Sequence, residues 1–280
     1  MSSATASLTT VDDESVGGSP RRSSKSSPAL RTLGRIVRPS IVVVAFLILW
    51  EFAAAQEWIE PSFPSRPSDV WTALIDFAVS GRLWTQTLAT MQAVVISFII
   101  GTVLGTALGF AIGVFPGLDR WIGALLVPLN SIPRIALAPL FILWFGLTMT
   151  SKVMLAVSIV FFMLLFNARA AVKSVDTDHM VLSRVLGLSK AAVLAKVVFP
   201  SAVPSIFAGV RLAITYSLLG VITSEMIAAQ DGLGQDIVYF SSRLQIGGVW
   251  AVLLVLAILA TLINVGFDAL ESRLLRWQAR

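Results

Sequence analysis

Long apolar segments dominate this sequence, and they restrict its possible folds more than any other feature. Five of them are long enough to cross the hydrocarbon layer of a membrane as a helix, and a shorter one precedes them. The six segments lie at about 40–56, 88–114, 121–145, 153–170, 205–228 and 249–270. Only 13% of the residues are charged, whereas soluble proteins contain about 25%. The sequence therefore predicts an all-α integral membrane protein with six transmembrane helices.

The first 38 residues differ from the rest of the chain. They are rich in serine and contain acidic and basic residues but few apolar ones, a composition typical of disordered segments. We expect a disordered cytosolic tail at 1–38 and a membrane domain at 39–280. A secretory signal peptide cleaved near Ala55 is the competing interpretation. It is disfavoured because the basic leader is long for a signal peptide and Glu51 interrupts the apolar run.

The distribution of positive charge predicts the orientation of the spans. With the N-terminus in the cytosol, the only Lys and Arg residues outside are Arg66, Arg82, Lys152 and Arg243. Arg134 lies within a span, and all the others lie on the cytosolic side. Cytosolic loops of membrane proteins carry such an excess of positive charge. We therefore expect a multi-pass protein of the plasma membrane with both termini in the cytosol.

The composition also argues against several kinds of site. The chain has no cysteine and one histidine, His179, which argues against metal centres and a Ser-His-Asp triad. In a soluble protein, a net charge of +5 would suggest binding to nucleic acid. Here the positive residues are explained by the orientation of the spans, so we expect no nucleic-acid partner. No Walker A loop, dinucleotide fingerprint or nucleophile elbow is present. We therefore expect no cofactor in this chain. If the six spans form a transporter, its energy would come from an ion gradient or from ATP hydrolysed by a separate subunit.

A polar loop at about 171–204 separates the fourth and fifth spans and predicts two short helices. The first covers His179 to Leu186, and Gly187 ends it by adopting a positive φ. Ser189 caps the second, Lys190 to Phe199, which Pro200 ends. The N-cap oxygens of the first helix come from Asp176, Thr177 and Asp178.

The first of these helices has an apolar side. Its apolar residues recur four positions apart, as Val181 with Val185 and Leu182 with Leu186. Ser183 and Arg184 face elsewhere. A helix of two turns is not stable alone in water and needs a surface to dock on.

Glycine recurs at every fourth position of the second span. The four residues are Gly101, Gly105, Gly109 and Gly113. Such a stripe lets a neighbouring helix approach backbone to backbone. Tight packing within one subunit is the favoured interpretation, and a face on which helices slide during transport is the alternative.

The third span contains Pro128, Pro133 and Pro139, which predict kinks and unpaired carbonyls. Irregular backbone is tolerated in a membrane where it is buried in protein or lines a wet cavity. We therefore take the polar residues between these prolines as candidates for the translocation path, with Glu225 of the fifth span: Asn130, Ser131, Arg134 and Glu225.

The two charged candidates leave alternatives open. Arg134 either faces the path, where it would favour an anion, or is a structural partner for Glu225 or for exposed carbonyls, or reaches the interface. Glu225 pairs with Arg134, gates the path or, as the favoured alternative, marks the outer boundary of its span.

The spacing between Gly187 and Pro200 is shared with a known family. Nine residues follow Gly187 before Val197-Val198-Phe199-Pro200. The same spacing occurs in the cytosolic loop of the permease subunits of bacterial ATP-binding-cassette importers, which this chain resembles from Trp50-Glu51 to its C-terminus. Their loop begins with Glu-Ala-Ala, and the chain departs from this pattern by having Val181, Leu182 and Ser183 there.

Further motifs resemble the nitrate, sulfonate and taurine branch of that family. They are Pro64-Ser65-Arg66-Pro67, Ile132-Pro133-Arg134, Ala138-Pro139-Leu140, Trp144-Phe145-Gly146 and Phe207-Ala208-Gly209-Val210-Arg211.

This resemblance implies a type I ABC importer permease fold in the bacterial inner membrane. It implies a homodimer of permeases, two cytosolic ATPase subunits that hold ATP and Mg²⁺, and an extracytoplasmic solute-binding protein. The helix from Asp178 to Leu186 would sit in a cleft of the ATPase, so that closure of the ATPase pair moves it and switches the path between outward and inward access. The ATPase-coupling residues would be Asp178, His179, Val181, Leu182, Ser183, Arg184, Leu186, Gly187 and Pro200.

The branch implies a small anionic solute, namely an aliphatic sulfonate, taurine or nitrate. Similar permeases import thiamine precursors and riboflavin, and bicarbonate is a further alternative. The competing classes are a gradient-driven transporter or channel without an ATPase and a membrane scaffold that moves nothing. We expect the chain itself not to be an enzyme.

Overall fold

The computed structural model describes residues 28–56 and 65–274, and all regular structure in these ranges is helical. The chain divides into two units, Met1–Leu49 and Trp50–Arg280. The described residues of the first unit form the beginning of α1 (Pro28–Ala55). Residues 1–27 of the predicted tail lie outside the described ranges, and α1 begins before the predicted tail boundary at residue 38.

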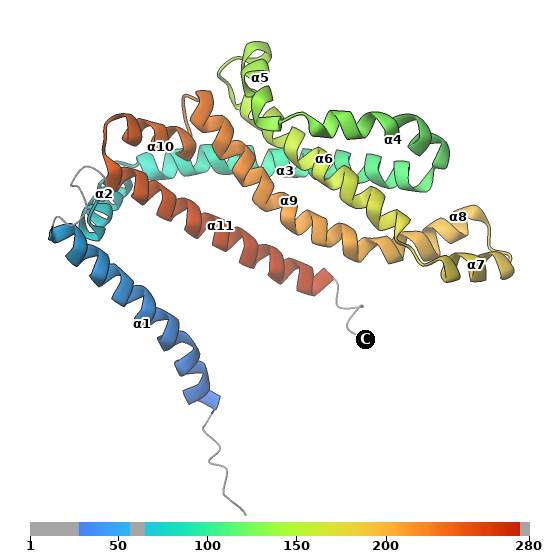
Figure 1. Cartoon of the computed structure of the whole chain (residues 1–280), viewed down its shortest axis with the longest axis horizontal. Coiled ribbons are helices and arrows are strands. Elements are labelled where there is room, and N and C mark those ends of the chain that lie inside the picture. Colours follow the sequence, from blue (N-terminus) through green and yellow to red (C-terminus); the bar gives the residue numbers. More distant parts are fainter. Residues whose placement is uncertain (1–27, 57–64, 275–280) are drawn as a thin grey trace, which may run out of the picture. The chain divides into compact units, whose positions relative to one another are not determined.

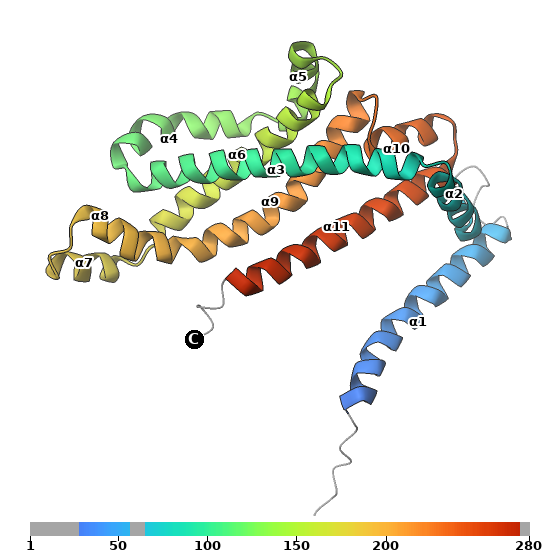
Figure 2. The same ribbon diagram turned by 180° about the vertical axis from the view of Figure 1, so that it is seen from behind.

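Three long helices form the centre of the second unit. α3 (Arg82–Val114), α6 (Met149–Lys173) and α9 (Phe199–Ala228) pack against one another, and both views show them side by side (Figure 1, Figure 2). Leu155, Leu164 and Leu165 of α6 are fully buried. α6 is therefore the helix around which the other two are arranged.

The glycine stripe of α3 lies against α6. A Cβ atom on Gly105 would stand 2.5 Å from the carbonyl oxygen of Phe161, and one on Gly101 would stand 2.7 Å from the Val160 side chain. Gly109 and Gly113 meet Leu165 and Val172 in the same way. Absence of side chains thus lets the two helices approach closely.

The third predicted span is broken. α4 (Pro116–Ser131) is followed by a 3₁₀ turn, η1 (Arg134–Leu137), and by α5 (Ala138–Phe145), and the two halves are bent by 85°. The break falls at Ile132, whose ψ of 123° is extended, because the ring of a following proline disfavours helical backbone. The predicted kink is confirmed, and it is sharp enough to turn the chain nearly at a right angle.

The predicted end of the second loop helix at Pro200 is wrong. α8 (Lys190–Val193) continues through a five-residue π-helix, η2 (Leu194–Val198), into α9. The Phe199 N–H donates to the Leu194 carbonyl, five residues earlier. This wider turn comes directly before Pro200, whose missing N–H and bulky ring would disturb an ordinary α-helical turn. The helix consequently runs without interruption from Lys190 to Ala228.

Two short helices and the start of a long one lie at the end of the unit opposite to the loop (Figure 1). α2 (Pro67–Val79) and α10 (Leu233–Ser242) both pack on α11 (Ile246–Leu274). Phe77, Leu233, Ile237, Val252 and Leu256 form their shared core.

Within the described residues, four helices are long and apolar enough to cross a membrane, and the bent α4–α5 pair makes a fifth. The four are α3, α6, the continuous helix from Lys190 to Ala228, and α11. The segment predicted as the first span falls in α1, where Val44–Ala55 is a shorter apolar helix. The all-helical membrane fold is confirmed, whereas the count of six spans stays a prediction.

Candidate functional site

The polar loop after α6 forms a capped helix, α7 (Thr177–Val185). At its start the Asp178 N–H donates to Asp176 Oδ1 at 2.8 Å, so Asp176 is the N-cap among the three candidates. At its end Gly187 has a φ of 67°, and the Leu188 N–H donates to the Ser183 carbonyl at 3.1 Å. A left-handed glycine with this long hydrogen bond is a common way to close a helix, and the predicted end at Gly187 is confirmed.

α7 turns one side inward and leaves its apolar side open. Met180 packs on the core formed by the ends of α6 and α9, and Ser183, only 3% exposed, donates to the His179 carbonyl at 2.6 Å. The apolar residues that were predicted to share a side are between 54% and 79% exposed. These four, Val181, Leu182, Val185 and Leu186, are called the α7 apolar face below. The side chain of Arg184 lies outside what the structure describes.

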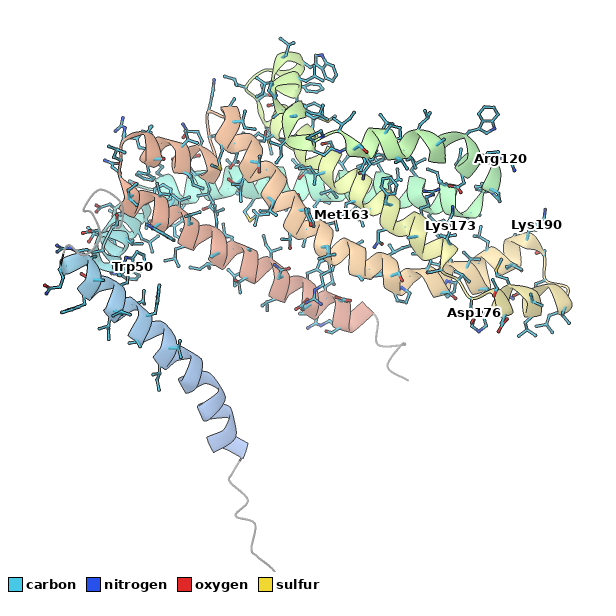
Figure 3. All side chains as sticks on the ribbon, viewed as in Figure 1. Trp50, Arg120, Met163, Lys173, Asp176 and Lys190 are labelled. Carbon is cyan, nitrogen blue, oxygen red and sulfur yellow. The ribbon has the colours of Figure 1, made fainter. Side chains whose placement is uncertain are left out.

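An ion-pair cluster braces the helix ends beside α7. Asp119 in the first turn of α4 accepts a hydrogen bond from Arg169 at 2.7 Å and one from Lys173 at 2.5 Å, both near the end of α6. Figure 3 shows Arg120, Lys173, Asp176 and Lys190 at this same end of the unit. The cluster ties α4 to α6 immediately before the chain enters α7, and the sequence patterns did not reveal it because its members are 50 and 54 residues apart.

A cavity of about 980 Å³ lies between this brace and α7–α8. Phe115 and Lys173 line one part of it, and Met180, Lys190 and Leu194 line another. This space separates part of α7 and α8 from the ends of α3 and α6.

The break between α4 and α5 gathers three of the four path candidates. Asn130 and Ser131 are exposed, and Arg134 is half-buried. One terminal N–H group of Arg134 donates to the Leu129 carbonyl at 2.7 Å, and its guanidinium carbon lies 3.7 Å from the centre of the Phe162 ring. Arg134 therefore satisfies a carbonyl freed by the end of α4.

Glu225, the fourth candidate, lies in a separate buried polar cluster at the α10 end of the unit. It is 1% exposed and accepts hydrogen bonds from the Thr90 hydroxyl at 3.0 Å and from the Gly234 N–H at 2.9 Å. Lys152 Nζ lies 3.7 Å from its carboxylate and donates to the Asp231 carbonyl at 2.7 Å. Glu225 is thus paired with Lys152 and not with Arg134, and this cluster fixes the turn between α9 and α10.

A second ion pair lies beside that cluster. Arg82, at the start of α3, donates to Asp236 of α10 at 2.8 Å, and the Asp236 carboxylate is fully buried. Burial raises the pKa of the Asp236 carboxyl, and the hydrogen bond from Arg82 acts in the opposite direction. Neither Lys152 nor Asp236 was a predicted site residue, since their partners are distant in the sequence.

The geometry described above combines several apolar spans, a span broken at prolines and an exposed capped helix. Residues 101–276 match the family described as binding-protein-dependent transport system inner membrane component. The chain belongs to this family. It is an ABC importer permease subunit, and such permeases act with ATPases and solute-binding proteins.

Two curated relatives of this permease differ in the solute for which they are named. The chain is 34% identical over 261 residues to the riboflavin transport system permease protein RibX of Chloroflexus aurantiacus, which covers 90% of this chain and 96% of the relative. It is 30% identical over 251 residues to the taurine transport system permease protein TauC of Escherichia coli K12, and the match covers 88% of this chain and 91% of the relative.

A solved structure shares the permease fold. It is the MetNI methionine ABC transporter in an inward-facing conformation, with a TM-score of 0.56, 22% identity, and coverage of 65% of this chain and 91% of that chain. The predicted type I importer fold is therefore confirmed.

Proposed function

We propose that this permease carries a small anionic solute, namely an aliphatic sulfonate, taurine or nitrate, into the cytoplasm with energy from a separate ATPase docked on α7. The observation that carries the proposal is the α7 apolar face. Three exposed apolar side chains on a nine-residue helix, with Leu186 directly after it, are unfavourable in water, and covering them with a partner surface is favourable. Their high exposure supports an apolar contact in place of the acidic start found in related loops.

In this proposal two permease copies form a homodimer that contacts two ATPase subunits on the cytosolic side. ATP and Mg²⁺ are held by the ATPases, and a solute-binding protein delivers the solute from the opposite side. The positive charge at the α7 end, which includes Arg120, Lys173 and Lys190 (Figure 3), supports a cytosolic position for that end and for both termini.

Arg134 supports an anionic solute. It is the cation at the break between α4 and α5, where exposed Asn130 and Ser131 adjoin it, and its guanidinium has donors left for a sulfonate or nitrate group. Riboflavin, a thiamine precursor and bicarbonate are the alternatives, because related permeases serve different solutes. The ligand that co-purifies with the partner binding protein identifies the solute directly.

The docking proposal is tested by one substitution and its matched control. Val185 of α7 is 79% exposed and Val79 of α2 is 82% exposed, so changing either to Ser removes a similar apolar surface from the isolated chain. Burial of a valine contributes about 1.5 kcal/mol, or about tenfold in affinity. We expect Val185→Ser to weaken co-purification of the ATPase about tenfold and Val79→Ser to leave it unchanged.

Uptake in liposomes tests the energy source. Labelled taurine, sulfonate and nitrate are offered to liposomes that contain the permease with its binding protein, with or without the ATPase. We expect uptake only with the ATPase and ATP. Uptake at the same rate without the ATPase would overturn the ATP-driven mechanism and favour a gradient-driven transporter.

A further inference from the structure

We propose that α2 lies along the surface layer of the membrane and that its exposed apolar side, made of Trp71, Ile75 and Val79, contacts phospholipid. These three residues are called the α2 lipid face below. The partner surface is the boundary between the head groups and the acyl chains of one leaflet, which is the outer leaflet if the α7 end is cytosolic. This contact adds an interaction surface to the transport function, and it depends on the membrane fold alone.

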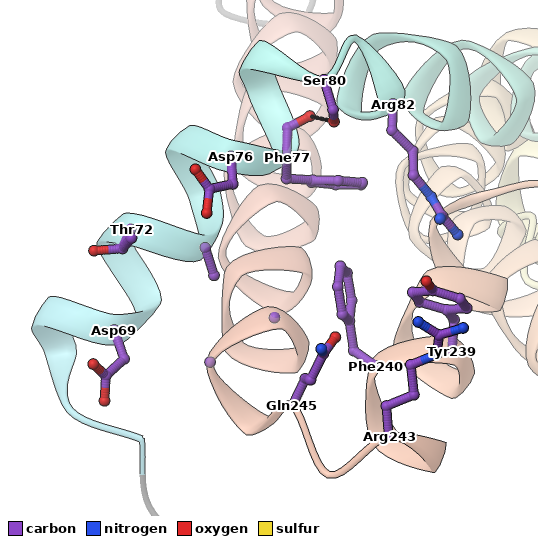
Figure 4. Close-up of a pocket in the computed structure, with 13 residues that line it drawn as sticks. Asp69, Thr72, Asp76, Phe77, Ser80, Arg82, Tyr239, Phe240, Arg243 and Gln245 are labelled. Carbon is purple, nitrogen blue, oxygen red and sulfur yellow. Dashed lines mark hydrogen bonds between the residues drawn. The ribbon is translucent and has the colours of Figure 1, made fainter.

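α2 turns one side to the protein and another to water. Phe77, only 4% exposed, belongs to the core shared with α10 and α11 and meets the Phe240 ring edge to face at 5.9 Å. Figure 4 shows Thr72 and Asp76 on the side of α2 that faces away from that ring. Both are exposed, as is Asp69, and their spacing of three and four residues places all three on one side of the helix.

The third side of α2 is apolar and uncovered. Trp71, Ile75 and Val79 recur at four-residue spacing and are 62%, 46% and 82% exposed. A helix that packs only on its own protein needs one apolar side, with the rest polar. A second apolar side next to a polar one suits a membrane surface, where lipid and water lie on adjacent sides of the helix.

The turn from α2 into α3 places α2 at the membrane boundary. Only Ser80 and Gly81 separate the two helices, and Gly81, with a φ of 74°, lets the chain change direction. Both views show α2 at a steep angle to α3, at the end of that helix (Figure 1, Figure 2). The 33 residues of α3 are about 50 Å long, whereas the hydrocarbon layer is about 30 Å thick. The end of α3 that carries α2 therefore reaches the head groups.

Two further exposed tryptophans lie at this end of the unit. Trp84 is at the start of α3 and ends an exposed apolar side that continues through Leu88, Val95 and Ile99, as expected of a side that faces lipid. Trp250 is near the start of α11. Tryptophan is enriched where lipid meets water. The lipid-facing side of α3 thus ends next to the turn from α2, and the α2 lipid face continues it.

The composition of α2 also indicates what holds it at the surface. Its 13 residues include Asp69 and Asp76 but no Lys or Arg, so anionic head groups do not attract it. The contact with lipid is therefore apolar, and the packing of α2 on α11 keeps it in place. Because charge plays no part in this contact, we expect salt to leave it unchanged.

The test uses the full chain, which has no cysteine, in nanodiscs of phosphatidylcholine. Spin labels are attached to single-cysteine variants of the α2 lipid face. Their collisions with oxygen, which concentrates in lipid, and with a nickel chelate, which stays in water, are measured by electron paramagnetic resonance. A label in lipid meets oxygen, a label in water meets nickel, and a label covered by protein meets little of either.

Three labelled controls are included. Thr72→Cys and Asp76→Cys report on the polar side of the same helix. Val185→Cys is matched to Val79→Cys, because these two valines are 79% and 82% exposed but Val185 lies in the polar loop. Three separate positions on the α2 lipid face keep the test independent of any one substitution.

We expect the ratio of oxygen to nickel collisions to be at least about tenfold higher on the α2 lipid face than in the controls, since burial of one apolar side chain changes its contact with water by about this factor. Frequent nickel collisions at all three positions would place this face in water and overturn the proposal. Few collisions with either reagent would also overturn it, because a protein such as a second copy or the solute-binding protein would then cover the face. Failure of ATP-driven uptake would leave these results unaffected.

Discussion

Replacing Gly187 tests whether the closure of α7 matters for coupling. Its φ of 67° is the left-handed conformation, and an added Cβ would meet no atom within 4 Å. A substitution therefore introduces backbone strain without a steric clash. A left-handed conformation costs an L-residue about 1–2 kcal/mol, with β-branched residues at the upper end, whereas asparagine tolerates it. About 2 kcal/mol corresponds to about a thirtyfold shift in the population of the closed helix end.

The predicted order of coupling is Gly, then Asn, then Ala, then Val. The assay is the number of solute molecules taken up per ATP hydrolysed in liposomes that hold permease, ATPase and binding protein. We expect Gly187→Val to reduce this ratio at least tenfold and Gly187→Asn to change it less than twofold, because only the former destabilises the closed end of α7.

Two other glycines serve as controls for this series. Gly81, with a φ of 74°, also has no atom near an added Cβ, so Gly81→Val adds comparable strain at the opposite end of the unit. Gly117 has the same free space but no positive φ. Unchanged coupling in Gly187→Val, or an equal loss of coupling in Gly81→Val, would refute the assignment of α7 closure to energy transmission.

Three further predictions concern the path, the buried polar cluster and the glycine stripe. Arg134→Ala should reduce anion uptake at least tenfold with ATPase binding intact, and Arg134→Lys should retain part of it; normal uptake by the Ala variant in a flux assay would leave Arg134 with its structural role at Leu129 only. Glu225→Ala should lower the free energy of unfolding by about 3–5 kcal/mol, because it leaves Lys152 buried without this partner. Thermal unfolding measures this loss, and Thr223→Ala, which removes an exposed hydroxyl from the same helix, is the control. Gly105→Val should lower the free energy of unfolding by about 1–3 kcal/mol, because its side chain would contact the Phe161 backbone. Gly266→Val is the control, since the space at Gly266 is open. Equal stability of the two variants would contradict the close approach of α3 and α6.

The parts of this structure that depend on neighbouring residues could be predicted from the sequence. Gly187 ends α7 and Ser189 caps α8 through the Ala192 N–H at 3.3 Å, since both depend on local backbone chemistry. The break near Pro133 was predicted for the same reason. Its 85° bend was not, because the angle depends on packing against α6.

Pairings between distant residues could not be predicted. Charge counting placed Lys152 in an outer loop, whereas the structure buries it with Glu225 and Asp231. Pro200 likewise indicated a helix end, and only the hydrogen bond from Phe199 to Leu194 shows how the helix continues past it. In both places a tertiary or non-standard local arrangement outweighed the preference of the single residue.

The uninterrupted helix from Lys190 to Ala228 has a mechanical consequence. Its 39 residues make a rod of about 58 Å, with the end of the polar loop at one tip and Glu225 near the other. In its middle part Gly209 and Gly220 touch Asn167 and Ala156 of α6, which makes this contact a natural fulcrum. A tilt of about 5° about the middle of such a rod displaces each tip by about 2.5 Å, and a push on the tip beside α7 swings the tip beside Lys152 in the opposite direction.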